Sequence, residues 1–192
     1  MGELILVRHA KSAWNDLGQW TGWEDVSLSD DGRKQAVETA EHLRGMKSDK
    51  AYVSDLKRCT ETLDIIIEHL GLAIPVIVAP AIKERNYGVF TGKNKWQIKD
   101  EIGEVEFQKL RRGWNTPIPE GETLQDVYKR AVPYFIETIL PDLKAGENVL
   151  VVAHGNSLRA LAKYLEDISD EKIADLEIGV GEAHVYELDE QG

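Results

Sequence analysis

Two apolar segments of the chain end in the same way, and this repeated ending constrains the fold more than any other feature of the sequence. The stretch ILVRHAKS begins at Ile5, and the stretch LVVAHGNS begins at Leu150. In both, the apolar run leads into a histidine, a small residue, one further residue and a serine, ahead of a predicted helix. Strands of such continuous apolar character are buried on both faces, which is typical of a parallel sheet between two layers of helices.

The other hydrophobic patterns agree with this interpretation, because short apolar runs alternate with helical segments. The predicted strands cover residues 4–7, 51–53, 76–78 and 149–152, and AHVYEL near the C-terminus predicts a further strand at a sheet edge. The predicted helices cover residues 29–45, 55–70, 123–140 and 156–165, and Pro133 is expected to kink the third. We therefore expect an α/β fold, a three-layer sandwich with a mostly parallel central sheet flanked by helices.

The chain is long enough for one well-buried core, since it has 192 residues and no linker or internal repeat divides it. We expect residues 1–192 to form a single domain. Residues 86–119 differ from the rest, because they are rich in Gly, Lys, Arg, Trp and Pro and lack a clear strand pattern. This segment is predicted to be a small cap over one end of the sheet.

Charge and cysteine content exclude several classes of function. The formal net charge of −11 repels nucleic acid and anionic membranes, so any anion must bind in a local basic pocket. The single cysteine, Cys59, excludes an internal disulfide and most cysteine-based zinc sites. Together with a start that does not resemble a signal peptide, this predicts a cytoplasmic protein. The sequence leaves the oligomeric state open between a monomer and a homodimer.

The matching strand ends predict an anion site. If the two strands are neighbours, His9 and His154 face each other beyond the carboxyl ends of the sheet, where open α/β folds bind ligands. Arg8 precedes the first histidine, and Arg58 lies about one turn into the helix after the second strand. Further candidates for the outer part of this anion site are Lys11 and the pair Arg111 and Arg112.

This group of side chains suits phosphoryl transfer. Guanidinium groups bind phosphate oxygens bidentately, and a neutral imidazole nitrogen can attack phosphorus. A general acid must protonate the leaving alcohol, and Glu84 in KERNYG is the best candidate for that role.

Other interpretations of these residues are weaker. A single histidine after a strand is most often structural, but the repeated ending argues against that for His9 and His154. The arginines nearby would repel a metal ion, so we expect no metal. A phosphate-binding protein without catalysis stays open as an alternative. A missing catalytic group would favour it, but none is missing from this sequence.

The sequence also resembles the histidine phosphatase superfamily and, within it, the short form of the cofactor-dependent phosphoglycerate mutases. The resemblance covers almost the whole chain, with its motifs in the order of the family. These motifs are LVRHAKSAWN, WTGWEDVSLSDDG, SDLKRCTETL, KERNYGVFTGKNK, LRRGW, ETILPDLKAGENVLVVAHGNSLRALAKYL and HVYELDE.

The resemblance implies a phosphoglycerate mutase-like fold and a role for each matching residue. His9 would become a phosphohistidine, Arg8, Arg58 and His154 would hold the transferring phosphoryl group, and Glu84 would donate and accept the proton. The residues that would line the phosphate pocket are Ser12, Asn15, Thr21, Gly22, Gly155 and Asn156. Those that would hold the substrate's carboxylate and other phosphate are Tyr87, Lys95, Arg111 and Arg112.

In that scheme, 2,3-bisphosphoglycerate primes the enzyme as a phosphoryl donor. The phosphoryl group then moves between the 3- and 2-hydroxyls of phosphoglycerate, in glycolysis or gluconeogenesis, without a metal. The expected partner is therefore a small phosphorylated substrate, with neither nucleic acid nor membrane.

Some positions depart from the mutase pattern and keep a second function open. Ala10 and Lys11 replace the usual Gly and Glu, Asn86 replaces a common histidine, and NTPIPEG is shorter than the insertion of many mutases. Arg-His-Ala-Lys is more typical of small phosphohistidine phosphatases in the same superfamily. Ala10 fits only if its φ is negative, because a β-carbon disfavours the left-handed region. The alternative function is a broad phosphomonoesterase or phosphohistidine phosphatase with the same chemistry.

Overall fold

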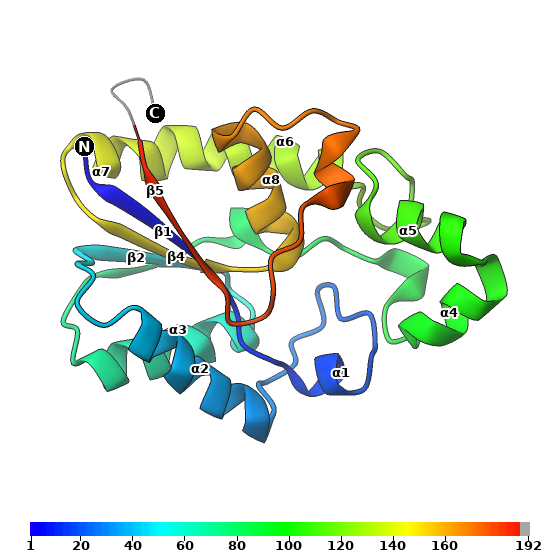
Figure 1. Cartoon of the computed structure of the whole chain (residues 1–192), viewed down its shortest axis with the longest axis horizontal. Coiled ribbons are helices and arrows are strands. Elements are labelled where there is room, and N and C mark those ends of the chain that lie inside the picture. Colours follow the sequence, from blue (N-terminus) through cyan, green and yellow to red (C-terminus); the bar gives the residue numbers. More distant parts are fainter. Residues whose placement is uncertain (189–192) are drawn as a thin grey trace.

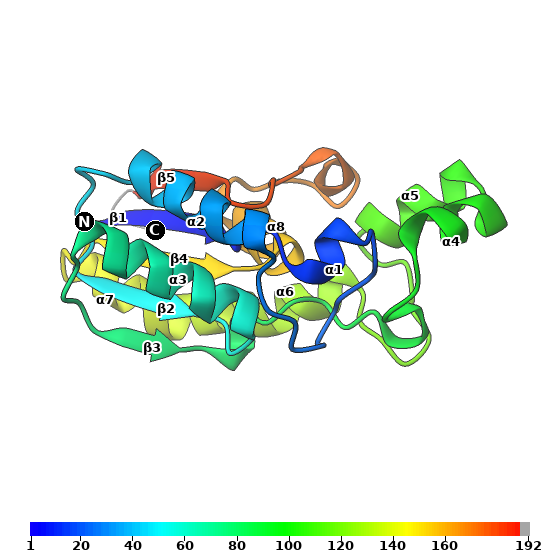
Figure 2. The same ribbon diagram turned by 90° about the horizontal axis from the view of Figure 1, so that it is seen from below.

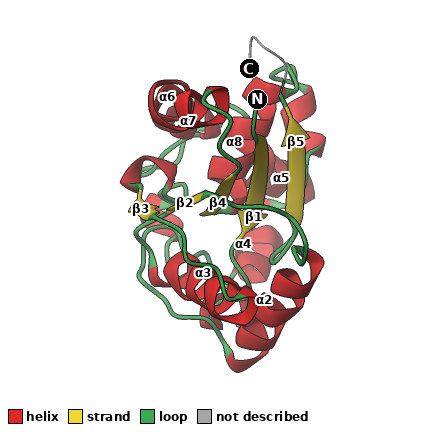
Figure 3. Cartoon of the chain, turned by 90° about the vertical axis from the view of Figure 1, so that its left-hand side faces the viewer, coloured by secondary structure: helices red, strands yellow, loops and turns green. Residues whose placement is uncertain are grey.

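The computed structural model describes residues 1–188, and its centre is a five-stranded sheet with helices on both faces (Figures 1 and 3). The strand order is β3-β2-β4-β1-β5. β5 pairs antiparallel with β1 at one edge, and the other pairs are parallel. The strands are β1 (Glu3–Arg8), β2 (Lys50–Val53), β3 (Val76–Val78), β4 (Val149–Ala153) and β5 (Ala183–Glu187). The predicted sandwich with a mostly parallel sheet is therefore confirmed, and so is the edge strand.

The central strands are buried on both faces, as their continuous apolar character predicts. On one face, α2 (Asp30–His42) and α3 (Lys57–Leu70) pack against Ile5 and Val7 of β1. On the other face, Leu4 and Leu6 pack among side chains of α6 (Leu124–Tyr134), α7 (Leu140–Lys144) and α8 (Gly155–Leu165). Successive residues of a strand point to opposite faces, so one short strand contributes to both halves of the core.

Local sequence signals explain where the first two long helices begin and end. The Ser29 hydroxyl accepts a hydrogen bond from the Gly32 backbone N–H at 3.1 Å, which caps the first turn of α2. α3 ends at Gly71, which has a φ of 65°, in the left-handed region that glycine adopts most readily. Cys59 lies in α3 and is fully buried, so it fills the core between this helix and the sheet.

The helical region after residue 123 runs further than the sequence predicts. The predicted end at residue 140 is wrong, because a π-helical turn over Phe135–Ile139 joins α6 to α7, which continues to Lys144. Pro133 lies inside α6 without ending it. Pro141 is the second residue of α7, directly after the π-helical turn, and the helical region continues past it.

Residues 86–119 lie beyond the carboxyl ends of the strands, where Figures 1 and 2 show α4 (Lys95–Ile102) and α5 (Glu104–Arg112). These helices have a small apolar cluster of their own, in which Ile98 and Phe107 pack around Trp20 and Tyr87. The segment is thus built separately from the two layers that cover the sheet, and it stands next to the strand ends where the sequence predicts the site.

Short helical segments complete the described chain. They are α1 (Ala13–Asp16) and single 3-10 turns at Pro80–Ile82, Gly88–Phe90 and Lys172–Asp175. Within residues 1–188, no helix has both the length and the apolar character needed to cross a membrane.

Candidate active site

The sheet brings the two matching strand ends together. β1 and β4 are parallel neighbours with Arg8 opposite Ala153, so the next residue of each strand is a histidine. The imidazole rings of His9 and His154 meet edge to face, with their centroids 5.1 Å apart. Both rings are buried, and His154 lies against His9 without lining the cavity itself.

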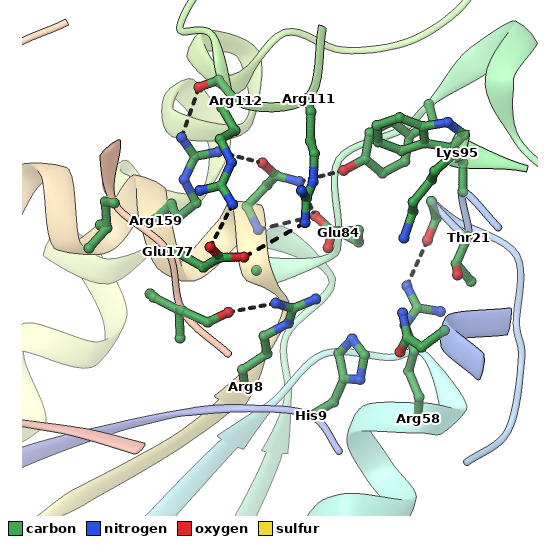
Figure 4. Close-up of a pocket in the computed structure, with 18 residues that line it drawn as sticks. Arg8, His9, Thr21, Arg58, Glu84, Lys95, Arg111, Arg112, Arg159 and Glu177 are labelled. Carbon is green, nitrogen blue, oxygen red and sulfur yellow. Dashed lines mark hydrogen bonds and ion pairs between the residues drawn. The ribbon is translucent and has the colours of Figure 1, made fainter. Parts of the chain in front are cut away.

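A single cavity collects most of the predicted site residues (Figure 4). The predicted residues that line it are Arg8, His9, Asn15, Thr21, Gly22, Arg58, Glu84, Tyr87, Lys95, Arg111, Arg112, Gly155 and Asn156. We call Arg8, His9, Arg58 and His154 the floor, since they come from the sheet end and from α3. We call Lys95, Arg111 and Arg112 the rim.

His9 is held as a neutral imidazole with one nitrogen fixed. Its Nδ1 lies 2.7 Å from the carbonyl oxygen of Ala10, which can only accept, so Nδ1 carries the proton. Nε2 therefore has a free electron pair, and no hydrogen bond to it is found within residues 1–188. Burial, and then the positive charges of Arg58 and Arg8, lower the pKa of His9 well below its usual value. At neutral pH His9 is thus an uncharged imidazole beside two cations, with the electron pair that a nucleophile needs.

The same factors act on His154. Burial is the main cause, followed by the positive charge of Arg58 and by repulsion from His9 whenever that ring is protonated, and together they lower the pKa of His154 well below its usual value. Its Nε2 lies 2.8 Å from the Ser54 hydroxyl and 3.3 Å from the Cys59 sulfur. The ring is therefore fixed in the core as a neutral neighbour of His9.

Backbone carbonyls hold the two floor arginines in place. The Arg58 guanidinium is almost fully buried and donates to the carbonyls of Gly22 and Glu24 at 2.7 and 2.9 Å. Gly22 has a φ of 53°, a conformation that L-residues rarely adopt, and this turn aims its carbonyl at the guanidinium. Because carbonyls carry no net charge, the positive charge of Arg58 stays available to an anion.

Arg8 is placed by close backbone packing. It donates to the carbonyl of Ile178 at 2.5 Å, and its buried Nε has no hydrogen-bond partner within the described residues. A β-carbon on Gly155 would lie 3.2 Å from the guanidinium carbon of Arg8, so a residue without a side chain lets α8 approach this arginine. The N-terminus of α8 adds its positive dipole end to the same place.

Glu84 lies in the wall of the cavity with one oxygen fixed. Its Oε1 accepts from the backbone N–H of Arg85 at 2.7 Å and from the Asn156 side-chain amide at 3.0 Å. That amide also donates to the Tyr87 hydroxyl at 2.8 Å. No hydrogen bond to Oε2 is found within residues 1–188, so this oxygen is available to exchange a proton with a ligand.

The rim carries cations from the segment beyond the sheet. Burial and the charges of Arg111 and Arg8 lower the pKa of Lys95 to about 8. Burial, and then the charge of Arg112, also lower the pKa of Arg111. Glu177 makes an ion pair with Arg112 at 2.7 Å and a longer one with Arg111 at 3.7 Å. The rim is therefore a second basic group, opposite the floor, that already contacts a carboxylate.

Besides His154, two sequence candidates lie outside the cavity. Ser12 does not line it, because its hydroxyl caps α1 and accepts from the backbone N–H of Asn15 at 3.2 Å. Lys11 makes an ion pair with Asp16 at 3.5 Å instead of extending the basic group. Ala10 has a negative φ, as its β-carbon requires, and is fully buried.

Sequence analysis missed two charged residues that line the cavity, Arg159 and Glu177. Arg159 is buried and donates to the side-chain oxygen of Asn156 at 3.1 Å and to the carbonyl of Arg112 at 2.8 Å. Its position one helical turn after Asn156, within an otherwise apolar helix, was a usable signal. Glu177 had no local signal, because its contact with the rim depends on how the loop before β5 folds back.

Metal ligands are not gathered anywhere in the described chain. Within residues 1–188, no group of three or more His, Cys, Asp or Glu side chains is arranged to hold a metal ion.

The fold and the cavity define an α/β protein in which basic side chains surround a histidine at the carboxyl ends of the strands. Residues 4–192 match the model of the histidine phosphatase superfamily (branch 1), and the chain belongs to this enzymatic superfamily. The resemblance found in the sequence motifs is thereby confirmed.

Relatives of two kinds lie close to this chain. A protein of Cytophaga hutchinsonii named 2,3-bisphosphoglycerate-dependent phosphoglycerate mutase is 43% identical over 185 residues, covering 96% of this chain and 87% of the relative. A Corynebacterium diphtheriae protein of the same name is 41% identical, covering all of this chain and 88% of the relative. Among solved structures, a mycobacterial glucosyl-3-phosphoglycerate phosphatase in complex with VO3 superposes with a TM-score of 0.85 at 26% identity. That superposition covers 96% of this chain and 90% of the other.

Proposed function

We propose that this chain interconverts 3-phosphoglycerate and 2-phosphoglycerate through a phosphohistidine at His9. The main support is the presence of two basic groups in one cavity, the floor around His9 and the rim with Lys95, Arg111 and Arg112. A substrate with a phosphate and a carboxylate has one anion for each group. The names of the curated relatives support the same activity.

In the proposed first step, Nε2 of His9 attacks the phosphorus of the bound phosphate ester. The N–P bond forms as the P–O bond to the alcohol breaks, so the phosphoryl group moves onto the protein. The neutral state of His9 keeps this electron pair available at pH 7. Arg8 and Arg58 stabilise the negative charge on the phosphoryl oxygens as it redistributes in the transition state.

Glu84 supplies the proton that the leaving oxygen needs. Its fixed Oε1 orients the carboxyl group, and the unpaired Oε2 delivers the proton to the alkoxide. In the return step the same oxygen takes a proton from the hydroxyl that attacks the phosphohistidine. Transfer to the free hydroxyl of 3-phosphoglycerate gives 2,3-bisphosphoglycerate. When Nε2 of His9 then takes the phosphoryl group from the 3-oxygen, 2-phosphoglycerate is left and His9 is phosphorylated again.

The charges that line the cavity suit 2,3-bisphosphoglycerate, which would be the phosphoryl donor that primes His9. The floor would hold the transferred phosphate, since within residues 1–188 the Arg8 and Arg58 guanidiniums bind only uncharged carbonyls. Lys95, Arg111 and Arg112 would hold the other phosphate and the carboxylate. We infer that residues 86–119 act as a cap that excludes water while the phosphohistidine waits for an acceptor.

Hydrolysis of phosphomonoesters is the second candidate function. The mycobacterial relative in the structure comparison is titled a phosphatase, and its fold matches this chain at a TM-score of 0.85. The two functions share the floor and Glu84. They differ in whether water or a second hydroxyl takes the phosphoryl group from His9.

Phosphorus NMR of the purified protein with 3-phosphoglycerate distinguishes these functions. We expect a 2-phosphoglycerate signal that grows only when a catalytic amount of 2,3-bisphosphoglycerate is added. Release of inorganic phosphate without 2-phosphoglycerate would contradict the mutase and favour the phosphatase. A His9→Ala variant, run beside the wild type, controls for contaminating mutase.

A further inference from the structure

A carboxylate of the protein itself occupies part of the rim. Glu177 follows the last 3-10 turn, in the loop that leads to β5, and its side chain reaches the cavity (Figure 4). It binds Arg112 at 2.7 Å and also contacts Arg111 at 3.7 Å. These two guanidiniums are the groups proposed above to hold the second anion of the substrate.

The contact is built so that it can open. The Glu177 side chain is 59% exposed, so a change of its rotamer places the carboxylate in solvent without unfolding anything. Arg112 is only 18% exposed and stays in the cavity. The neighbouring residue is fixed, because the carbonyl of Ile178 accepts from Arg8. The backbone is thus anchored to the floor while the acidic side chain is free to leave the rim.

We propose that Glu177 is a specificity-determining residue that competes with the substrate's carboxylate or second phosphate for Arg111 and Arg112. A ligand with a second anionic group must displace Glu177 or bind beside its negative charge, and either outcome weakens binding. A phosphomonoester with an uncharged remainder needs only the floor. Glu177 therefore shifts the preference of the cavity toward ligands with a single anionic group.

This inference rests on the proposed function, because it takes the rim as the place of the second anion. The expected change in relative affinity follows from the exposure of the ion pair between Glu177 and Arg112. Partly exposed pairs contribute modestly to binding and stability, so removal of the Glu177 charge is expected to change relative affinity by about fivefold.

Two ligands with the same carbon skeleton isolate the effect. 3-Phosphoglycerate carries a carboxylate where glycerol 3-phosphate carries a hydroxymethyl group. Their dissociation constants are measured by isothermal titration calorimetry without bisphosphoglycerate, so that isomerisation is not primed. The wild type is compared with Glu177→Gln, Glu177→Asp and, as a charge-matched control, Glu68→Gln at the far end of α3, where the side chain is exposed.

We expect Glu177→Gln to improve the affinity for 3-phosphoglycerate relative to glycerol 3-phosphate by about fivefold. Glu177→Asp keeps the charge and is expected to retain most of the wild-type ratio, whereas Glu68→Gln leaves the ratio unchanged. An unchanged ratio in Glu177→Gln, or weaker binding of 3-phosphoglycerate, would overturn the proposal. Weaker binding would mean that Glu177 positions the arginines for the substrate.

The variant Arg112→Ala separates this inference from the proposed function. If Arg112→Ala weakens binding of 3-phosphoglycerate and Glu177→Gln has no effect, the rim holds the second anion and competition by Glu177 is wrong. If neither variant changes the ratio, the rim does not hold the second anion, and the proposed function loses its main support. A shift in Glu177→Gln supports the competition even if phosphorus NMR detects only hydrolysis.

Discussion

The floor and the rim of the cavity carry the same kind of charge but are built in different ways. Floor residues follow directly from strands and from α3, and all of them except the partly exposed Arg8 are buried. Backbone carbonyls fix Arg8, His9 and Arg58, and the Ser54 hydroxyl fixes His154. The rim arginines come from α5 and are partly exposed. Their partner is the exposed carboxylate of Glu177. A rigid floor suits the common chemistry, and an adaptable rim suits the choice of substrate.

Under the proposed function, this difference would account for relatives named as mutases and others titled as phosphatases. The covalent step needs only a neutral histidine, two arginines and an acid. Retention of the second anion, and protection of the phosphohistidine from water, depend on the rim and the segment that carries it. Variants in the two regions should therefore fail in different ways.

The largest effect is expected at the centre of the floor. His9→Ala removes the nucleophile, so turnover should fall by on the order of 10⁵-fold, and no phosphoryl group should be found on the protein. Intact-protein mass spectrometry after incubation with a phosphoryl donor detects the modification. Activity above a few per cent, or phosphorylation of the variant, would remove His9 from this role.

Loss of the general acid is expected to have the next largest effect. Glu84→Gln keeps the size of the side chain but cannot exchange a proton, so kcat should fall by about 10²- to 10⁴-fold. Esters with a better leaving group need less protonation and should lose less. A matched kcat comparison of 3-phosphoglycerate and p-nitrophenyl phosphate measures this, and an equal loss for both would argue against proton donation.

A change in the rim should affect the substrate more than the chemistry. Arg112→Ala removes a charged hydrogen-bond donor, so kcat/KM for 3-phosphoglycerate should fall by about 10- to 100-fold. The loss for p-nitrophenyl phosphate should be much smaller, because its remainder carries no anion. Steady-state kinetics on the two substrates tests this, and equal losses would mean that floor and rim are not separable.

The smallest effect concerns pH. Lys95 has a pKa of about 8, lowered by burial and by Arg111 and Arg8, so it is cationic at pH 7 and loses its charge as the pH rises. The kcat/KM for 3-phosphoglycerate should therefore fall by up to about tenfold between pH 7 and 9. His9 is already neutral throughout this range and does not contribute. Lys95→Arg should move the decline to higher pH, and an unchanged profile would exclude Lys95 as its source.

The difference between the floor and the rim also determines how much of the candidate site could be predicted from the sequence. The floor was predictable because each residue has a fixed offset from a strand or helix, and neighbouring parallel strands bring those offsets together. The repeated serine has a simpler explanation than ligand binding. Ser12 caps α1, and the Ser157 hydroxyl accepts from the backbone N–H of His154 at 3.1 Å.

The rim could be predicted from the sequence only in part. Arg111 and Arg112 were outer candidates because they form a basic pair, and Lys95 was identified only through the family resemblance. No local pattern directs a helix beyond the sheet toward the strand ends. The contact of Glu177 joins residues far apart in the chain through an exposed loop, and it leaves no periodic signal. The end of the helix after Pro133 was also misjudged, because a π-helical turn joins α6 to α7 and the helical region continues to Lys144.

The most direct test of this account follows the fate of the phosphoryl group on His9. The protein is phosphorylated, freed of donor, and divided between buffer and buffer containing 3-phosphoglycerate. We expect the phosphoprotein to persist in buffer and to transfer its phosphoryl group rapidly to 3-phosphoglycerate, giving a bisphosphate. Rapid loss to inorganic phosphate in both samples, at the same rate, would contradict the proposal that the rim and its segment select the acceptor.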